Sequence, residues 1–141
     1  MRRWRDTEAG DASLELILLA PVLLALIGLV IAAGRISVAR GSVEAAARDA
    51  ARQASIARSP GEAVAAAQLS ADTALSHDGL DCDPVVNVDT SGFGVPVGQP
   101  AQVSATVICT VPLGDLVVPG LPGSQTLTYT FTSPLDPFRG R

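Results

Sequence analysis

The strongest pattern in the sequence is an uninterrupted apolar run near the N-terminus. Nineteen consecutive residues, 16–34 (LILLAPVLLALIGLVIAAG), carry no charge, and twelve of them are Leu, Ile or Val. At about 1.5 Å per residue, a helix of this length spans about 30 Å, the thickness of one hydrocarbon core. Glu15 and Arg35 stand at the two ends of the run, where lipid head groups can solvate them. The pattern predicts a transmembrane helix over about residues 16–34.

Two other interpretations compete for this run. A secretory signal peptide has a shorter apolar stretch of about 7–15 residues and then a small-residue cleavage site, and no turn signal follows the run here. A buried helix of a soluble domain would need other segments to surround it, and nothing else in the chain is large enough. We therefore favour a retained transmembrane helix. Pro21 lies inside it and is expected to bend it, because proline removes one backbone donor.

The helical pattern continues past the apolar run. Residues 35–58 are rich in Ala, Arg and Glu, contain no proline, and place Glu44 four residues before Arg48, an arrangement that favours a helix. Small residues recur at every fourth position: Ala33, Ser37, Gly41 and Ala45. Such a stripe lets another helix pack closely, although the high alanine content alone would also produce it. A single helix over residues 11–58 would be about 70 Å long, so we expect a partner to cover part of it.

A second, shorter helix is predicted over residues 59–78. Ser59 can cap it, Pro60 suits the first helical position, and Glu62 stands where a capping box needs an acid. Four residues form its thin apolar face: Val64, Gln68, Ala71 and Leu75.

The period changes from helix to strand in residues 79–141. Hydrophobic and polar residues alternate in 102–111 and in 125–132, which is typical of half-buried strands, and 85–89 is a shorter candidate. Together the patterns predict an α+β fold. It consists of a long N-terminal transmembrane helix with an extracytoplasmic extension, a second short helix, and a small antiparallel β-sheet at the C-terminus.

The two cysteines, Cys82 and Cys109, test the predicted hairpin. A register that pairs Val88 with Val103 also places the cysteines opposite each other, within reach of a disulfide. Such a bond would stabilise the domain by about 3 kcal/mol and would place it outside the cytoplasm. Two free buried thiols are the alternative. A redox site is disfavoured because no C-x-x-C motif is present.

Composition and charge exclude several classes of function. Over 141 residues the chain is 48% hydrophobic but only 4% aromatic, and its net charge of −4 gives no basic footprint for nucleic acid. The single histidine, His77, and the two cysteines provide too few ligands for a structural zinc site. His77 lies at a predicted helix end, and no G-x-S-x-G motif accompanies it. We expect no catalytic site, metal, cofactor or small-molecule substrate.

The residues before the apolar run have an order that resembles type IV prepilins and pseudopilins. A short basic leader, residues 1–10, ends at Gly10; Asp11 follows, and Glu15 stands directly before the run. In that family a membrane peptidase cuts after the glycine. The resemblance implies cleavage between Gly10 and Asp11 and a role for Glu15 in assembly. A new amine and a carboxylate at one membrane edge can neutralise each other between neighbouring subunits, where an unpaired charge is costly.

Further residues narrow the resemblance to one branch. The segments 10–15, Pro21, Gly34-Arg35 and 45–55 (AAARDAARQAS) together resemble the TadE-like family, the minor pseudopilins of the tight-adherence (Flp) pilus-assembly system. The resemblance covers about residues 9–58, and Pro21 joins Glu15 among its assembly residues. Asp11 stands where major pilins usually have an aromatic residue or methionine, which favours an assembly or minor-subunit role.

The resemblance implies a single-pass protein of the bacterial cell membrane. Its partners would be pilin-like subunits, pilus-assembly membrane proteins and a prepilin-type peptidase, with no role for nucleic acid. Arginines flank both ends of the apolar run, so the predicted orientation, with the N-terminus cytoplasmic and the C-terminal domain outside, depends on the cysteines and the short N-terminal tail. The alternative function is a single-pass envelope protein, unrelated to pili, that displays a small β-domain as a binding module.

Overall fold

The predicted α+β fold is confirmed. The computed structural model describes residues 7–116, 120 and 122–138. In chain order its elements are α1 (Thr7–Ile56), α2 (Pro60–His77), β1 (Val85–Asp89), the 3₁₀ turn η1 (Ser91–Gly94), β2 (Ala101–Pro112), the short α3 (Leu113–Leu116) and β3 (Ser124–Leu135). The described strands form one antiparallel sheet in the order β1-β2-β3.

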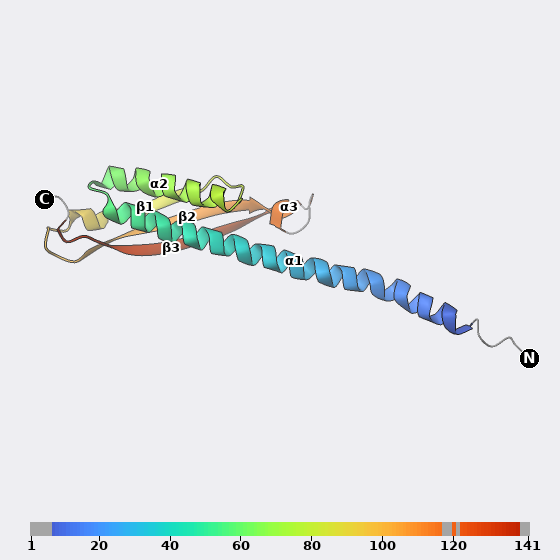
Figure 1. Cartoon of the computed structure of the whole chain (residues 1–141). Coiled ribbons are helices and arrows are strands. Elements are labelled where there is room, and N and C mark those ends of the chain that lie inside the picture. Colours follow the sequence, from blue (N-terminus) through green and yellow to red (C-terminus); the bar gives the residue numbers. More distant parts are fainter. Residues whose placement is uncertain (1–6, 117–119, 121, 139–141) are drawn as a thin grey trace, which may run out of the picture.

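The two long helices cover one face of this sheet (Figure 1). The C-terminal half of α1 contacts β2 and β3, and α2 runs back beside it and contacts β1. The N-terminal half of α1 projects away from the folded domain. The molecule is therefore a two-layer domain built on one end of a helix that continues far beyond it.

The inner face of α1 consists largely of alanine. Its buried side chains above the sheet are Ala39, Val43, Ala46, Ala47, Ala50, Ala51 and Ala54. Those of α2 are Ala63, Ala67, Ala71 and Leu75. Because the distance between packed helices depends on the side chains at the contact, these short methyl groups let the backbones of both helices lie close to each other.

The predicted apolar face of α2 is correct for only half of the helix. Ala71 and Leu75 are buried as expected, but Val64 is 43% exposed and Gln68 is half-buried. The buried positions repeat every fourth residue from Ala63, one residue before Val64. Close packing against α1 favours the small Ala63 at the contact over the bulkier Val64. Hydrophobicity alone predicts the opposite, because valine is the more hydrophobic of the two.

The N-terminus of α2 is capped as the sequence predicts. The backbone N–H of Glu62 donates to the side-chain oxygen of Ser59 over 3.3 Å. The Glu62 carboxylate accepts from the backbone N–H of Arg58 over 3.0 Å, one residue before the Ser59 N–H that the predicted capping box would use. Two donors that the helix cannot satisfy are thereby paired, and the chain is held in the tight reversal between α1 and α2.

The C-terminus of α2 is closed by a Schellman motif. The backbone N–H of Leu80 donates to the Leu75 carbonyl over 3.0 Å, and that of Gly79 donates to the Ser76 carbonyl over 3.1 Å. Gly79 has φ +70°, a left-handed conformation that costs other residues free energy because of their Cβ atom. The motif turns the chain from α2 toward β1.

The strand register differs from the prediction by two residues. Val88 of β1 lies opposite Ala105, not Val103, and the ladder of β1 with β2 ends at the pair Val85–Ile108. One further step in this register would place Pro84 opposite Cys109, and proline has no N–H for the ladder. A shift of two residues keeps every side chain on its predicted face, so Val103, Ala105, Val107 and Cys109 are buried as expected.

The loop from β1 to β2 is part of the reason for this shift. It contains η1, and Gly92 in that turn is buried against β2. A Cβ atom at Gly92 would overlap the carbonyl oxygen of Gln102. The turn therefore packs on the end of the sheet, an arrangement that a symmetrical hairpin loop does not anticipate.

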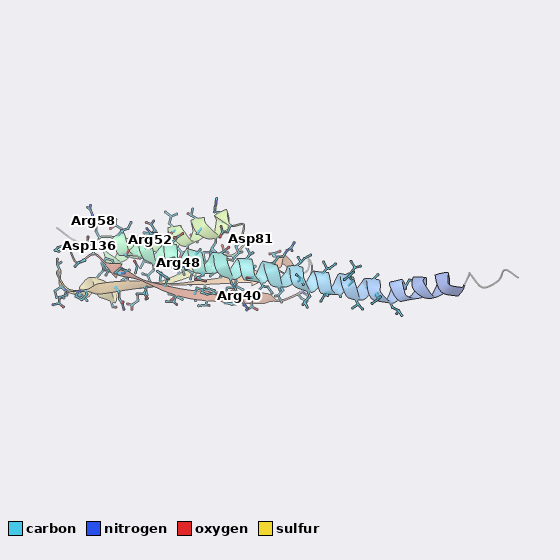
Figure 2. The ribbon with its side chains drawn as sticks, turned by 60° about the horizontal axis from the view of Figure 1, so that its bottom comes forward. Arg40, Arg48, Arg52, Arg58, Asp81 and Asp136 are labelled. Atoms are coloured by element: carbon cyan, nitrogen blue, oxygen red, sulfur yellow. A yellow bond between two sulfur atoms is a disulfide. The ribbon has the colours of Figure 1, made fainter. Side chains whose placement is uncertain are left out.

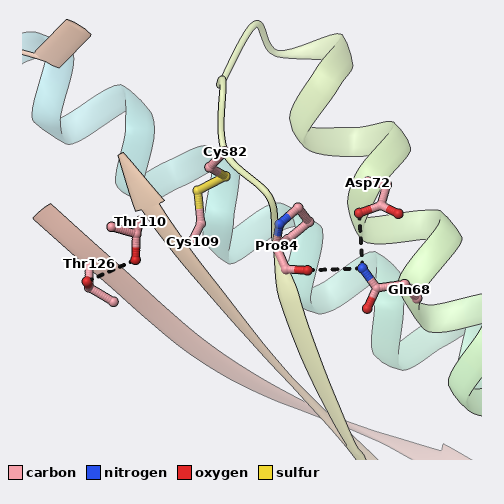
Figure 3. Close-up of a disulfide and its surroundings, with 7 residues drawn as sticks. All are labelled: Gln68, Asp72, Cys82, Pro84, Cys109, Thr110 and Thr126. Atoms are coloured by element: carbon pink, nitrogen blue, oxygen red, sulfur yellow. Dashed lines mark hydrogen bonds between the residues drawn. A yellow bond between two sulfur atoms is a disulfide. The ribbon is translucent and has the colours of Figure 1, made fainter. Parts of the chain in front are cut away.

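The predicted disulfide joins Cys82 to Cys109, with a Cα–Cα distance of 5.8 Å (Figure 3). Cys82 lies in the extended segment before β1, outside the ladder, while Cys109 is fully buried in β2. Gln68 of α2 donates to the Pro84 carbonyl over 3.0 Å, close to the disulfide in the same segment. The disulfide and this hydrogen bond fix the entry to β1 between the sheet and α2.

We predict that Gly79→Ala lowers the free energy of unfolding by about 1 kcal/mol, because alanine must adopt the left-handed conformation. No atom lies within 4 Å of an added Cβ, so the loss would come from backbone strain alone. Gly61→Ala is the matched control, with equally open surroundings and no positive φ. Denaturant unfolding followed by circular dichroism in detergent measures both variants. Equal stability of the two variants would contradict the prediction.

We predict that the double variant Cys82→Ala, Cys109→Ala loses about 3 kcal/mol of unfolding free energy, since the disulfide closes a long loop. Alanine avoids burying a hydroxyl group at position 109. The same unfolding experiment applies, with reduced wild-type protein as the second measurement. If reduction and substitution both left the midpoint unchanged, the disulfide would have no role in stability.

Candidate functional site

The N-terminal half of α1 is apolar and uncovered. Its large aliphatic side chains between Ile17 and Ile31 are 47–69% exposed. Exposed apolar surface on this scale marks contact with lipid or with other proteins. Within the described residues, α1 from Ile17 to Ile56 is the one helix long and apolar enough to cross a membrane.

The helix passes through Pro21 and the charged boundary without a break. α1 contains Pro21 and Arg35 within its 50 residues, so the apolar run and the segment that packs on the sheet form one helix. Among the described side chains, which begin at Ile17, the first one buried is that of Ala32, near the end of the apolar run. The folded domain therefore begins close to the boundary that the sequence assigns to the membrane.

The predicted cleavage and assembly residues lie near the start of α1. Gly10, Asp11 and Glu15 all belong to its helical backbone, which begins at Thr7, four residues before the predicted start. Residues 7–10 (TEAG) include Glu and Ala, which are good helix formers, and so extend the helix into the predicted leader. The described side chains of α1 begin at Ile17, so the contacts of Glu15 lie outside the described residues.

The predicted stripe of small residues is exposed. Ala33, Ser37, Gly41 and Ala45 all face away from the sheet and α2. A Cβ added to Gly41 would meet nothing within 4 Å. The stripe is thus not the face that packs within this chain, and contact with a second helix remains a prediction.

The buried alanine face of α1 was not identified from the sequence. Its members repeat at three- and four-residue spacing from Ala39 to Ala54, which is the available signal. Alanines also occupy exposed positions such as Ala45 in the same segment, so the signal does not single out one face.

Charged side chains of α1 also contact the β3 side of the domain. Glu44 and Arg48 form the predicted ion pair, with 3.0 Å between Oε1 and the guanidinium nitrogen. The same guanidinium lies over the ring of Phe131 in β3, 5.4 Å from its centre. This cation–π contact links the outer side of α1 to the edge strand.

The uncovered face of the sheet is polar. Threonine hydroxyls of β2 and β3 form hydrogen bonds across the strands, Thr106 with Thr130 over 2.7 Å and Thr110 with Thr126 over 3.1 Å. Such cross-strand pairs stabilise a sheet face that water can reach. This face needs no second layer of protein to cover it.

A hollow of about 770 Å³ lies at the end of the sheet near η1. Its polar lining includes Asp89, Ser91, Gln102 and Ser104. The Ser91 backbone N–H donates to the Asp89 carboxylate over 3.0 Å, which lowers the pKa of Asp89 and keeps it ionised. The hollow offers hydroxyl, amide and carboxylate groups.

No metal-binding cluster is found in the described ranges, where no three His, Cys, Asp or Glu side chains come together. His77 is exposed at the last position of α2, the helix end that the sequence predicts.

Comparison with known families finds a match at the N-terminal part of the chain. Residues 10–52 match the sequence model of a family described as TadE-like protein. The matched segment is 43 of the 141 residues, and it includes Gly10, Glu15 and Pro21. The match confirms the predicted resemblance to the TadE-like family and points to a Tad pilus-related protein. No curated protein and no solved structure matches the chain.

Proposed function

We propose that the chain is a TadE-like minor pseudopilin, a membrane-anchored structural or assembly component of a tight-adherence (Flp) type IV pilus or a related secretion system. The observation that carries this proposal is where the family match falls. It covers residues 10–52, and residues 17–31 within it are the apolar part of the helix that the folded domain leaves uncovered. The family signature and the surface that needs a partner therefore coincide.

The mechanism is one of anchoring and packing without catalysis. The apolar half of α1 would be buried in lipid and, during assembly, against the helices of other pilin-like subunits. Cleavage after Gly10 would create an amine at Asp11, close to the Glu15 carboxylate of a neighbouring subunit. The pair would remove two unsolvated charges from the membrane edge. Pro21, inside the same segment, would adapt the helix to this packing.

In the proposed orientation the N-terminus is cytoplasmic and the folded domain lies outside the cytoplasm. The bond between Cys82 and Cys109 supports this, because disulfides persist in oxidising compartments. The N-terminal leader would then face the cytoplasm, within reach of a prepilin-type peptidase at the inner membrane surface.

A binding module unrelated to pili is the second candidate function. The polar hollow near η1 favours it, since hydroxyl and carboxylate groups there could hold a polar ligand. Genetic context discriminates between the two: an adjacent secretion ATPase and prepilin-type peptidase support the pseudopilin, and pili that are normal after deletion of this gene would support the module.

We predict that Glu15→Ala reduces pilus yield about tenfold or more. The substitution would leave the amine at Asp11 of the neighbouring subunit without its carboxylate partner, and an unpaired charge inside a membrane costs several kcal/mol. Membrane insertion should be unaffected, since the apolar run is intact. Glu44→Ala is the control: it removes an exposed glutamate of the same helix that pairs with Arg48 outside the apolar run. Pili are counted by electron microscopy, and insertion is measured by carbonate extraction. Normal pili in Glu15→Ala would refute the role of Glu15.

We predict that the mature protein begins at Asp11. Intact mass spectrometry of membrane-extracted protein should show the loss of residues 1–10, and Gly10→Lys should retain them, because a bulky charged residue replaces the glycine at the cleavage site. A wild-type mature chain that still begins at Met1 would exclude prepilin-type processing.

A further inference from the structure

Charge is segregated along the chain. Residues 59–138 contain eight aspartates and glutamates and no arginine or lysine. Residues 35–58 contain five arginines and two acids. The part of α1 that follows the apolar run is therefore basic, whereas α2 and the sheet carry only negative formal charges.

The fold places one exposed residue of each sign, Arg40 and Asp81, on opposite sides of the molecule. Arg40 projects from α1 beside β3, and Asp81 follows α2, which covers β1 at the other edge of the sheet (Figure 2). Figure 2 shows the two residues on opposite sides and at about the same level along the long axis. Both side chains are exposed. Asp78 and Asp83, close to Asp81 in sequence, are exposed as well.

Anchoring in a membrane gives this geometry a consequence. Every copy with its apolar run in the bilayer holds Arg40 at the same height, about 9 Å above Gly34 along the helix. Asp81 lies at about that level on the opposite side, so Arg40 of one copy and Asp81 of its neighbour meet in the same plane. Two acidic sides brought together would repel each other.

We propose that copies of this chain associate side by side in the membrane, with Arg40 of one copy pairing with Asp81 of the next. The contact joins two different surfaces and so builds rows or rings of subunits, since the second copy keeps a free side of each sign. The inference rests on the proposed function only in assuming that all copies are anchored in the same orientation.

Arg40 is available for such a contact. Among the described residues it forms no ion pair, because Glu44, the acid one turn away on its own helix, is bound by Arg48 at 3.0 Å. Ser37, one turn before Arg40, and Gly41, next to it, are both small and exposed. Small residues beside the arginine allow the neighbouring chain to approach its guanidinium closely.

Fluorescence energy transfer between full-length chains tests the proposal. Copies labelled at the C-terminus with donor or acceptor are reconstituted in phosphatidylcholine vesicles, which carry no net charge, without any other pilus protein. The wild-type chain should associate, and raising the salt concentration should weaken the association because ions screen exposed charges. Arg40→Glu and Asp81→Arg should each weaken it about fivefold, since attraction is replaced by repulsion.

Exchanging the two charges tests whether Arg40 pairs with Asp81 in particular. The chain with both substitutions should recover to within about twofold of wild type, because each pair forms again with the signs exchanged. Mixing the two single variants should also restore association, since each then meets a complementary side. Arg52→Glu is the matched control: it makes the same charge change about 18 Å farther along α1 and should leave association within about twofold of wild type.

A monomeric wild-type chain, a double variant without recovery, or equal weakening by Arg52→Glu would each overturn the proposal. Recovery in the double variant also shows that neither substitution prevents folding. The outcome is independent of pilus yield, which tests the proposed function in cells. A chain that self-associates without supporting pili would refute only the proposed function, and one that supports pili as a monomer would refute only the pairing.

Discussion

The packing of the alanine face of α1 on the sheet is the contact on which the rest of the structure depends. The sheet has three described strands, and a small sheet of this kind needs a layer over its apolar face to be stable. The buried side chains of β2, such as Val103 and Val107, are covered by α1 together with α2. Only short side chains allow both helices to reach them. The folded domain therefore cannot be separated from the helix that continues beyond it as an apolar segment.

The features that the sequence predicted well depend on neighbouring residues. The cap at Ser59, the turn at Gly79 and the alternation in β2 follow from local conformation and period, and all are present in the structure. The disulfide was predictable because alternation fixes which face Cys109 occupies. The buried face of α2 and the hairpin register were not predictable in this way. The buried face depends on how closely α1 approaches Ala63, and the register depends on how η1 packs at Gly92. For the site, the order of residues from Gly10 to Glu15 supports only a prediction of cleavage and assembly roles. Alanine on several faces of α1 concealed which face of that helix is buried.

Side-chain size is more tightly constrained in α1, where the family match falls, than in the sheet. Residues 10–52 include both the uncovered apolar segment of α1 and most of the segment that packs on the domain, where close packing leaves little freedom of side-chain size. The sheet must only present an apolar face to α1, while its outer face carries threonines that water can solvate. Many sequences meet the second condition. The tighter physical constraints on α1 than on the sheet therefore favour a family match that falls within the helix.

The continuity of α1 has a mechanical consequence. A helix turns about 100° and rises about 1.5 Å with each residue, and α1 has no break between its uncovered half and the half that packs on the sheet. The rotational position of the domain around the helix axis is therefore fixed relative to every face of the apolar segment. A rotation of the segment within the bilayer becomes an equal rotation of the domain outside it. A continuous helix of this kind transmits torque as well as tension from the apolar segment to the folded domain.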